Sequence, residues 1–269
     1  MVPPYHSGSI LSGSNNHSFS LTVNKSVDVV NKTTSNHILS LKRRKKKVYR
    51  NSSNMNSSSN NNPLLSTLID VKDSVLVVID VQDAFVDKLN VDQDGPGLVK
   101  RIVWLVQMAK ELDVPLVVTA EDVPVLGSVC APLAVALGND KDTTMTTTPT
   151  TIPIYNKMVF GLVQEPEILA AIEKTRRKTI ILVGLETDVC VAHSALGLLA
   201  TGYQVAVVQD ATGSPGAAHQ YGLARMDRAG VVVTSVKGLY FEWARTVARD
   251  KELQAKMKAC PLLEPPVPL

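Results

Sequence analysis

The feature that most constrains this chain is an alternation, from residue 70 onward, of short apolar runs with stretches of helical periodicity. The run SVLVVID, residues 74–80, is almost continuously apolar, as expected of a central parallel strand buried on both faces. The pattern predicts further strands at 114–120, 154–158, 178–184, 204–211 and 231–236. It predicts helices at 97–112, 166–176, 189–201, 216–230 and 238–258. This alternation is typical of βαβ units.

Six strands and their crossover helices predict one α/β domain at residues 70–259. We expect a three-layer, doubly wound, mostly parallel six-stranded sheet in which 154–158 forms a short edge strand. Residues 260–269 contain four prolines, which indicates an extended, Pro-rich C-terminal tail.

Residues 1–69 form a different kind of segment, in which Ser and Asn fill 26 of 69 positions (15 Ser and 11 Asn). Such a composition offers little to bury and predicts a disordered N-terminal tail. Nine Lys or Arg against one acid give it a charge of +8, so subtraction from the total of +3 leaves about −5 for residues 70–269. The acidic balance of the folded part does not favour a nucleic-acid partner for the core. The basic cluster 42–47 fits a nuclear-import signal, an organellar transit peptide or a solvated tail without an address.

The cysteine content and the hydropathy of the sequence restrict the cellular compartments that fit this chain. Three cysteines lie 60 and 70 residues apart without a CxxC pair, which indicates neither a disulfide framework nor a structural zinc site. The strongly apolar runs are well short of the roughly 18 residues that cross a bilayer, so we expect no membrane partner. A cytoplasmic location follows as the default, with the nucleus or an organelle as the alternative that the basic tail would direct.

Candidate chemistry lies at the strand ends, because doubly wound sheets bind ligands outside the carboxyl ends of their strands. Asp80 ends the most apolar strand, Lys157 lies in the edge strand, and Cys190 opens a helix after the strand at 178–184. A helix N-terminus and a nearby ammonium would lower the pKa of the thiol. Each residue also has a structural interpretation: a core cysteine, a helix-capping Asp and a solvated Lys. Asp83 and Asp210 are competing strand-end acids.

Three motifs favour the chemical interpretation. The segment VLVVIDVQDAF (75–85) resembles the opening strand of the isochorismatase-like cysteine hydrolases, and YNKMVFGL (155–162) is similar to their K-x-x-F segment. The third, VGLETDVCVAHSALGLLATGYQVAVVQDAT (183–212), resembles their G-x-E-T-x-V-C-V turn and the helix and strand that follow it. The resemblance covers roughly residues 70–248, in the same order and spacing.

This resemblance implies a mechanism. In it Asp80 accepts the thiol proton, Lys157 orients the carboxylate and stabilises the thiolate, and Cys190 attacks the substrate. The backbone N–H groups of Glu186 and Cys190 would hold the oxyanion, with a cis peptide bond between Leu185 and Glu186. An acyl-thioenzyme would form and be hydrolysed by water.

Departures from the family pattern narrow the activity. Metal-dependent nicotinamidases use an Asp-x-His pair and a further His, but no histidine occurs between His37 and His193, so neither a metal nor a cofactor is expected.

Phe85 and Phe160, from the first two motifs, are assigned to the substrate pocket. His193 is more typical of a core or capping histidine.

The resemblance, with Cys190 as the nucleophile, implies hydrolysis of a small-molecule amide or a related C–N or acyl bond. The alternatives are a non-catalytic assembly or interaction module and a thiol redox sensor.

A homo-oligomer is also predicted, because apolar residues crowd the start of the last helix (Leu239, Tyr240, Phe241, Trp243, Val247). Three aromatic residues at positions i, i+1 and i+3 cannot share one helix face. We expect a contact that includes Tyr240 or Trp243.

Overall fold

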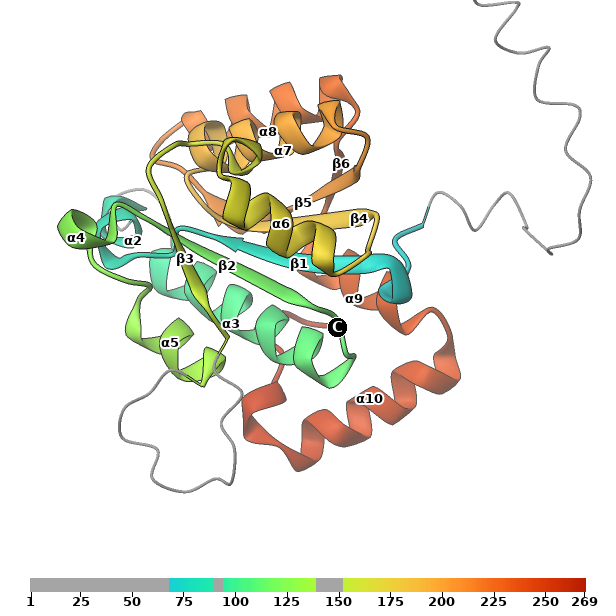
Figure 1. Ribbon diagram of the computed structural model, residues 1–269. Coiled ribbons are helices and arrows are strands. Elements are labelled where there is room, and N and C mark those ends of the chain that lie inside the picture. The colour runs from blue at the N-terminus through green and yellow to red at the C-terminus, as the bar shows by residue number, and fades with distance from the viewer. Residues whose placement is uncertain (1–67, 90–93, 139–151) are drawn as a thin grey trace, which may run out of the picture. The chain divides into compact units, whose positions relative to one another are not determined.

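The computed structural model describes residues 68–89, 94–138 and 152–269 (Figure 1). The predicted disorder of residues 1–69 therefore falls almost wholly outside the described residues. The Thr-rich tract at residues 143–153, which precedes the edge strand, also falls largely outside them.

The centre of the domain is a six-stranded sheet in which every pairing is parallel. Its strands lie in the order β3-β2-β1-β4-β5-β6. This confirms the predicted α/β class and the edge position of the strand around residue 155. The strand bounds are β1 Ser74–Ile79, β2 Leu116–Glu121, β3 Ile154–Lys157, β4 Thr179–Leu185, β5 Gln204–Gly213 and β6 Val232–Thr234.

Helices cover both faces of the sheet and complete the three layers (Figure 1). One face packs against α6 Pro166–Lys174, α7 Ala192–Ala200 and α8 Ala218–Ala229. The other packs against α3 Gly95–Glu111, α5 Ala131–Leu137 and α9 Val236–Ala244, with α10 Val247–Ala259 outside α9. Shorter elements are α2 Asp83–Leu89, α4 Val123–Leu126, η1 Val71–Asp73, η2 Leu162–Gln164, η3 Thr187–Val191 and η4 Pro261–Leu263. Within the described ranges, no helix has both the length and the apolar character needed to cross a membrane.

The strand order reverses direction between β1 and β4, which are neighbours at the centre of the sheet. Both strands are buried along their whole length. In doubly wound sheets the crevice at this reversal point, outside the carboxyl ends of the strands, is where ligands bind. The topology therefore places the residues that follow β1 and β4 at the centre of the expected site.

The stretch predicted to be helical, 238–258, is helical but is divided into two helices, α9 and α10. Arg245 has a φ of 62°, a left-handed conformation that cannot continue an α-helix. The hydroxyl of Thr246 then accepts a hydrogen bond from the backbone N–H of Arg249, so Thr246 caps the second helix.

The second helix and the C-terminus change the interpretation of the aromatic cluster. Tyr240 and Trp243 are 1% and 3% exposed within a single chain, so the predicted oligomer contact through them is wrong. Tyr240 packs on Trp104 and donates a hydrogen bond to Asp250 on α10. Phe241, by contrast, is 40% exposed, in agreement with the argument that three such residues cannot share one face.

The C-terminal residues pack on the domain instead of forming a free tail. Leu263 is buried, and its carbonyl accepts a hydrogen bond from the Trp104 indole N–H at 2.9 Å. Residues 260–269 thus contribute to the core layer on the α3 side.

Candidate active site

Three parallel strands deliver the predicted site residues to one edge of the sheet. Asp80 directly follows β1, Lys157 ends β3, and Cys190 lies in η3, the turn of π-helix that follows β4. Asp80 has a φ of 50°, which ends the extended conformation of β1 at this residue. The shared direction of the strands brings together residues separated by more than 100 positions in the sequence.

The side chains of these three residues meet in a buried cluster. The Lys157 ammonium lies 2.8 Å from Asp80 Oδ2 and 3.5 Å from the Cys190 Sγ. Asp80 Oδ1 accepts a hydrogen bond from the Thr119 hydroxyl at 2.8 Å. Asp80, Lys157 and Thr119 are fully buried, and Cys190 is 3% exposed. A buried carboxylate requires such partners, because an isolated one costs several kcal/mol.

A second carboxylate, Glu121, also belongs to the cluster, although its sequence context does not single it out as a candidate. Glu121 Oε2 lies 2.9 Å from Lys157 Nζ and accepts a hydrogen bond from the Cys190 thiol at 3.1 Å. It is the last residue of β2 and pairs with Lys157 in the sheet register. Glu121 is therefore a strand-end acid, and the rule that ligands bind outside the carboxyl ends of the strands applies to it as well.

Gln82, two residues after Asp80, fixes the main chain of Glu121. Its side-chain oxygen accepts the backbone N–H of Glu121 at 2.7 Å, and its amide nitrogen donates to the carbonyls of Glu121 and Gly127 at 2.8 and 2.7 Å. Gln82 is completely buried. Gln82, which belongs to the motif VLVVIDVQDAF, thus attaches the end of β2 and the following loop to the segment that follows β1.

Burial and neighbouring charges set the pKa directions in the cluster. Burial raises the pKa of Cys190, and the Asp80 carboxylate raises it further, against the opposing effect of Lys157. The pKa shift of the thiol is therefore opposite to the lowering expected from the sequence. Burial also raises the pKa of Asp80, although Lys157 and Thr119 oppose the shift. For Lys157, burial acts to lower the pKa, but Asp80 and the other acidic partners raise it.

The turn that carries Cys190 has the predicted backbone geometry. The peptide bond between Leu185 and Glu186 is cis, as the resemblance implied. The carbonyl of Glu186 accepts hydrogen bonds from the backbone N–H groups of Val189 and Val191 at 3.2 and 3.1 Å, which closes the turn. Cys190 is thus held at the base of α7, directly above the end of β4.

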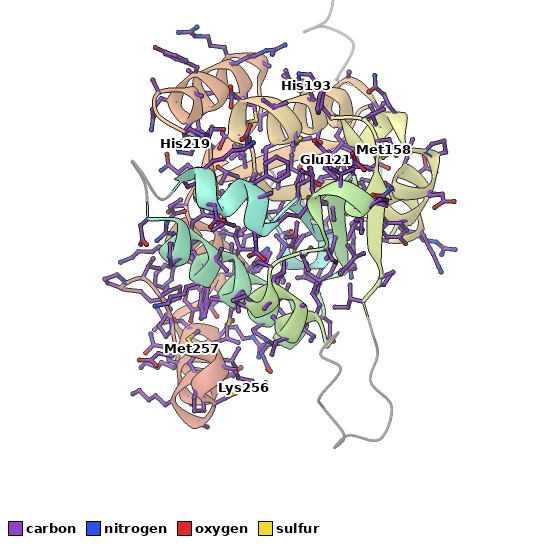
Figure 2. The ribbon with its side chains drawn as sticks, turned by 90° about the vertical axis from the view of Figure 1, so that its left-hand side faces the viewer. Glu121, Met158, His193, His219, Lys256 and Met257 are labelled. Carbon is purple, nitrogen blue, oxygen red and sulfur yellow. The ribbon has the colours of Figure 1, made fainter. Side chains whose placement is uncertain are left out.

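The two phenylalanines assigned to the substrate pocket occupy different environments. Phe85, on α2, is buried, and Lys88 Nζ lies 4.7 Å from the centre of its ring. Phe160 is 51% exposed, and its ring meets His193 edge-on with the centroids 6.0 Å apart. Figure 2 faces this edge of the sheet and shows Glu121 and Met158 below His193. A pocket role for either phenylalanine stays a prediction.

Asp80, Glu121 and Cys190 place potential metal-ligand atoms within 4.8 Å of one another. The Lys157 ammonium lies among these atoms and contacts both carboxylates at 2.8 and 2.9 Å. A fixed cation therefore already offsets part of the negative charge of the two carboxylates, and a metal ion would be repelled from the position that the ammonium occupies.

Comparison with known proteins finds one family over most of residues 70–259. The family model described as "Isochorismatase domain" matches residues 74–238. The chain is 34% identical over 173 residues to the secreted isochorismatase effector Isc1 of Phytophthora sojae, covering 64% of this chain and 77% of that protein. It is 30% identical over 190 residues to isochorismatase domain-containing protein 2 of Rattus norvegicus, covering 70% of this chain and 82% of the relative.

Solved structures share the fold. The Escherichia coli YcaC gene product, described as an octameric hydrolase of unknown specificity, has a TM-score of 0.62 at 21% identity, covering 71% of this chain and 89% of that one. The MAR1 ribonuclease from Caenorhabditis elegans has a TM-score of 0.61 at 24% identity, covering 75% and 98%. The sheet order, the cluster at its carboxyl edge and the matched family model lead to one conclusion: the chain belongs to the isochorismatase-like hydrolase family.

Proposed function

We propose that this chain is a cysteine-dependent hydrolase of a small-molecule amide or a related C–N or acyl bond. The observation that carries the proposal is the convergence of a thiol, an ammonium and a fully buried carboxylate within hydrogen-bonding reach. These are the groups that nucleophilic catalysis by cysteine requires: a nucleophile, a proton acceptor and a cation that stabilises the thiolate.

The first half-reaction begins with the protonated thiol. Asp80 accepts its proton, and because burial raises the pKa of Asp80, this carboxylate is a stronger base than an exposed one. The Cys190 sulfur attacks the carbonyl carbon while the Lys157 ammonium, 3.5 Å away, stabilises the thiolate. The backbone N–H groups of Glu186 and Cys190 hold the oxyanion. Asp80 then gives its proton to the leaving group, and a thioester remains on Cys190.

In the second half-reaction water attacks the thioester. Asp80 accepts a proton from the water, and the carboxylic acid product departs as the proton returns to the Cys190 sulfur. Each catalytic group ends in its starting state. The two half-reactions therefore consume one water for each C–N or acyl bond that is broken.

Charge and burial support a small neutral substrate over the alternatives. The charge of about −5 on residues 70–269 (a total of +3 minus +8 for residues 1–69) disfavours a polyanion such as RNA for the core, in contrast to the ribonuclease named for the C. elegans structure. A redox sensor needs Cys190 but no proton acceptor beside it, whereas in this chain a fully buried carboxylate, Asp80, belongs to the same cluster as the thiol. We propose a homo-oligomer by analogy with the E. coli octamer, and of the aromatic residues Tyr240, Phe241 and Trp243 only Phe241 is exposed for such a contact.

A hydrolysis screen over small amides, ureides and carbamates tests the proposal. We expect Cys190→Ala to abolish release of the amine or ammonia, and Asp80→Asn to reduce it by about 10²–10⁴-fold. Cys260→Ser is the matched control, because Cys260 is a free cysteine outside the cluster, and it should keep full activity. Hydrolysis that persists in Cys190→Ala would overturn the proposal.

A further inference from the structure

Glu121 is the most accessible acidic group of the cluster. Its side chain is 18% exposed, whereas those of Asp80 and Lys157 are completely buried. Its Oε2 is engaged by Lys157 Nζ and the Cys190 thiol. Its Oε1 receives no hydrogen bond from the described part of the chain. One carboxylate oxygen thus remains available as an acceptor beside the nucleophilic sulfur.

The position of this carboxylate is firmly determined. Gln82 binds both the N–H and the C=O of the Glu121 peptide, and the register of β2 with β3 pairs Glu121 with Lys157. Preorganised acceptors of this kind need no rearrangement when a substrate arrives. The protein therefore holds an acceptor at a defined place, which the proposed mechanism does not use.

The pKa of Glu121 is shifted in the opposite direction from that of Asp80. Burial acts to raise the pKa of Glu121, but hydrogen bonds from Lys157 and Cys190 and the charges of Lys157 and Lys88 lower it overall. The pKa of Asp80 is shifted upward. Two carboxylates in one site thus have different properties, one suited to carry a proton and the other to remain ionised.

We propose that Glu121 selects substrates whose leaving nitrogen bears hydrogen, through an N–H hydrogen bond to the available Oε1. This inference rests on the proposed function and names its substrate class, primary amides and ureides in preference to esters. Asp80 first transfers the proton that it took from the thiol to that nitrogen, which becomes positive, and the C–N bond then breaks with its electron pair on nitrogen, so that a neutral amine or ammonia leaves. Glu121 neither gains nor loses a proton, and its negative charge stabilises the nitrogen as it becomes positive.

The same carboxylate disfavours a negative group at this position, because two like charges at contact distance repel each other. The site should therefore prefer a neutral N–H donor to a neutral group without N–H, and that group to an anion. Three alkylating reagents of matched size represent these classes: iodoacetamide, methyl iodoacetate and iodoacetate. In each reaction the sulfur–carbon bond forms, the carbon–iodine bond breaks, iodide leaves with the electron pair, and the thiol proton is released to solvent.

The experiment measures the rate of Cys190 alkylation by peptide mass spectrometry on the full chain, each rate being divided by that of free N-acetylcysteine. Because a change in the pKa of Cys190 affects all three reagents equally, the ratio of iodoacetamide to methyl iodoacetate isolates the hydrogen bond. We expect this ratio to fall about tenfold in Glu121→Gln, which loses the charged acceptor. Glu121→Asp keeps the charge but withdraws the acceptor by one methylene, so the ratio should fall there too.

The relative rate of iodoacetate should rise in Glu121→Gln and stay low in Glu121→Asp, because only the first variant removes the negative charge. Glu173→Gln, which neutralises an exposed carboxylate on α6, is the matched control and should leave every ratio unchanged. A ratio of iodoacetamide to methyl iodoacetate within twofold of the parent in both Glu121 variants would overturn the inference.

These results are separable from the fate of the proposed function, because alkylation requires no turnover. If amide hydrolysis depends on Cys190 but the reagent ratio does not depend on Glu121, only the selecting role of Glu121 is refuted. If hydrolysis persists in Cys190→Ala, the proposed function fails, and the inference about its leaving group fails with it.

Discussion

Replacement of Gly184 by alanine tests the close approach of β1 and β4 that positions the cluster. Gly184 has a φ of 120°, and a Cβ placed there would lie 1.9 Å from the carbonyl oxygen of Ile79. A non-glycine residue in this backbone region costs about 1–3 kcal/mol. Relief of the clash requires the two central strands to separate, which costs typically another ~1–3 kcal/mol. We therefore expect Gly184→Ala to lose about 2–6 kcal/mol of unfolding free energy.

Gly202→Ala provides the matched control. Gly202 also has a positive φ, of 96°, but a Cβ there would meet no atom within 4 Å. This variant should show only the backbone cost, about 1–3 kcal/mol. The difference between the two variants measures the contact between β1 and β4 alone.

Urea unfolding of the full chain, followed by far-UV circular dichroism and analysed by linear extrapolation, supplies both free energies. Gly184→Ala should also lose hydrolytic activity at temperatures where it remains folded, because Ile79 directly precedes Asp80. If Gly184→Ala unfolds within about 0.5 kcal/mol of Gly202→Ala, the two strands do not approach as closely as described, and the reasoning is refuted.

Three further outcomes follow from burial and charge. Lys157→Met leaves Asp80 buried without its cation and should cost about 3–5 kcal/mol of unfolding free energy. Adding Asp80→Asn to the same chain should restore part of this loss, and a double variant as unstable as Lys157→Met alone would contradict the reasoning. Because the pKa of Cys190 is raised, its alkylation rate should keep increasing from neutral to alkaline pH, and Asp80→Asn should move this increase to lower pH. A rate in the parent protein that is already constant above neutral pH would be inconsistent with a raised thiol pKa. Trp243→Ala should destabilise the monomer by about 3–5 kcal/mol in the urea assay, since the indole is 3% exposed, and a loss below about 1 kcal/mol would show that it is not packed as described.

The central strands could be predicted from sequence because a strand that is buried on both faces needs a continuous apolar run, whereas a half-buried strand needs only alternate apolar residues. The meeting of Asp80, Lys157 and Cys190 followed from the parallel direction of their strands and from motifs of known order. Glu121 could not be predicted for a physical reason: the sequence around it is the same as that around any acidic residue between a strand and a loop. Only the pairing of β2 with β3 places it opposite Lys157.

The direction of the thiol pKa could not be predicted from sequence either. A helix N-terminus and a lysine both favour the thiolate, but the depth of burial and the presence of two carboxylates around one sulfur are tertiary facts. The break at Arg245 was hidden similarly, because nothing in its neighbours marks a left-handed residue between two helices. Asp210, a competing strand-end acid in the sequence, instead accepts the backbone N–H of Val236 at the start of α9.

The hydrogen bonds of Gln82 have a consequence for how this protein can diversify. All of its partners at Glu121 and Gly127 are peptide groups, which every residue except proline offers equally. The exposed side chains between these two anchor points, Pro124 and Val125, can therefore be exchanged without loss of either anchor, whereas Val123 and Leu126 pack against the core. A library of variants at positions 124 and 125 would change this surface while the end of β2 stays attached to Gln82.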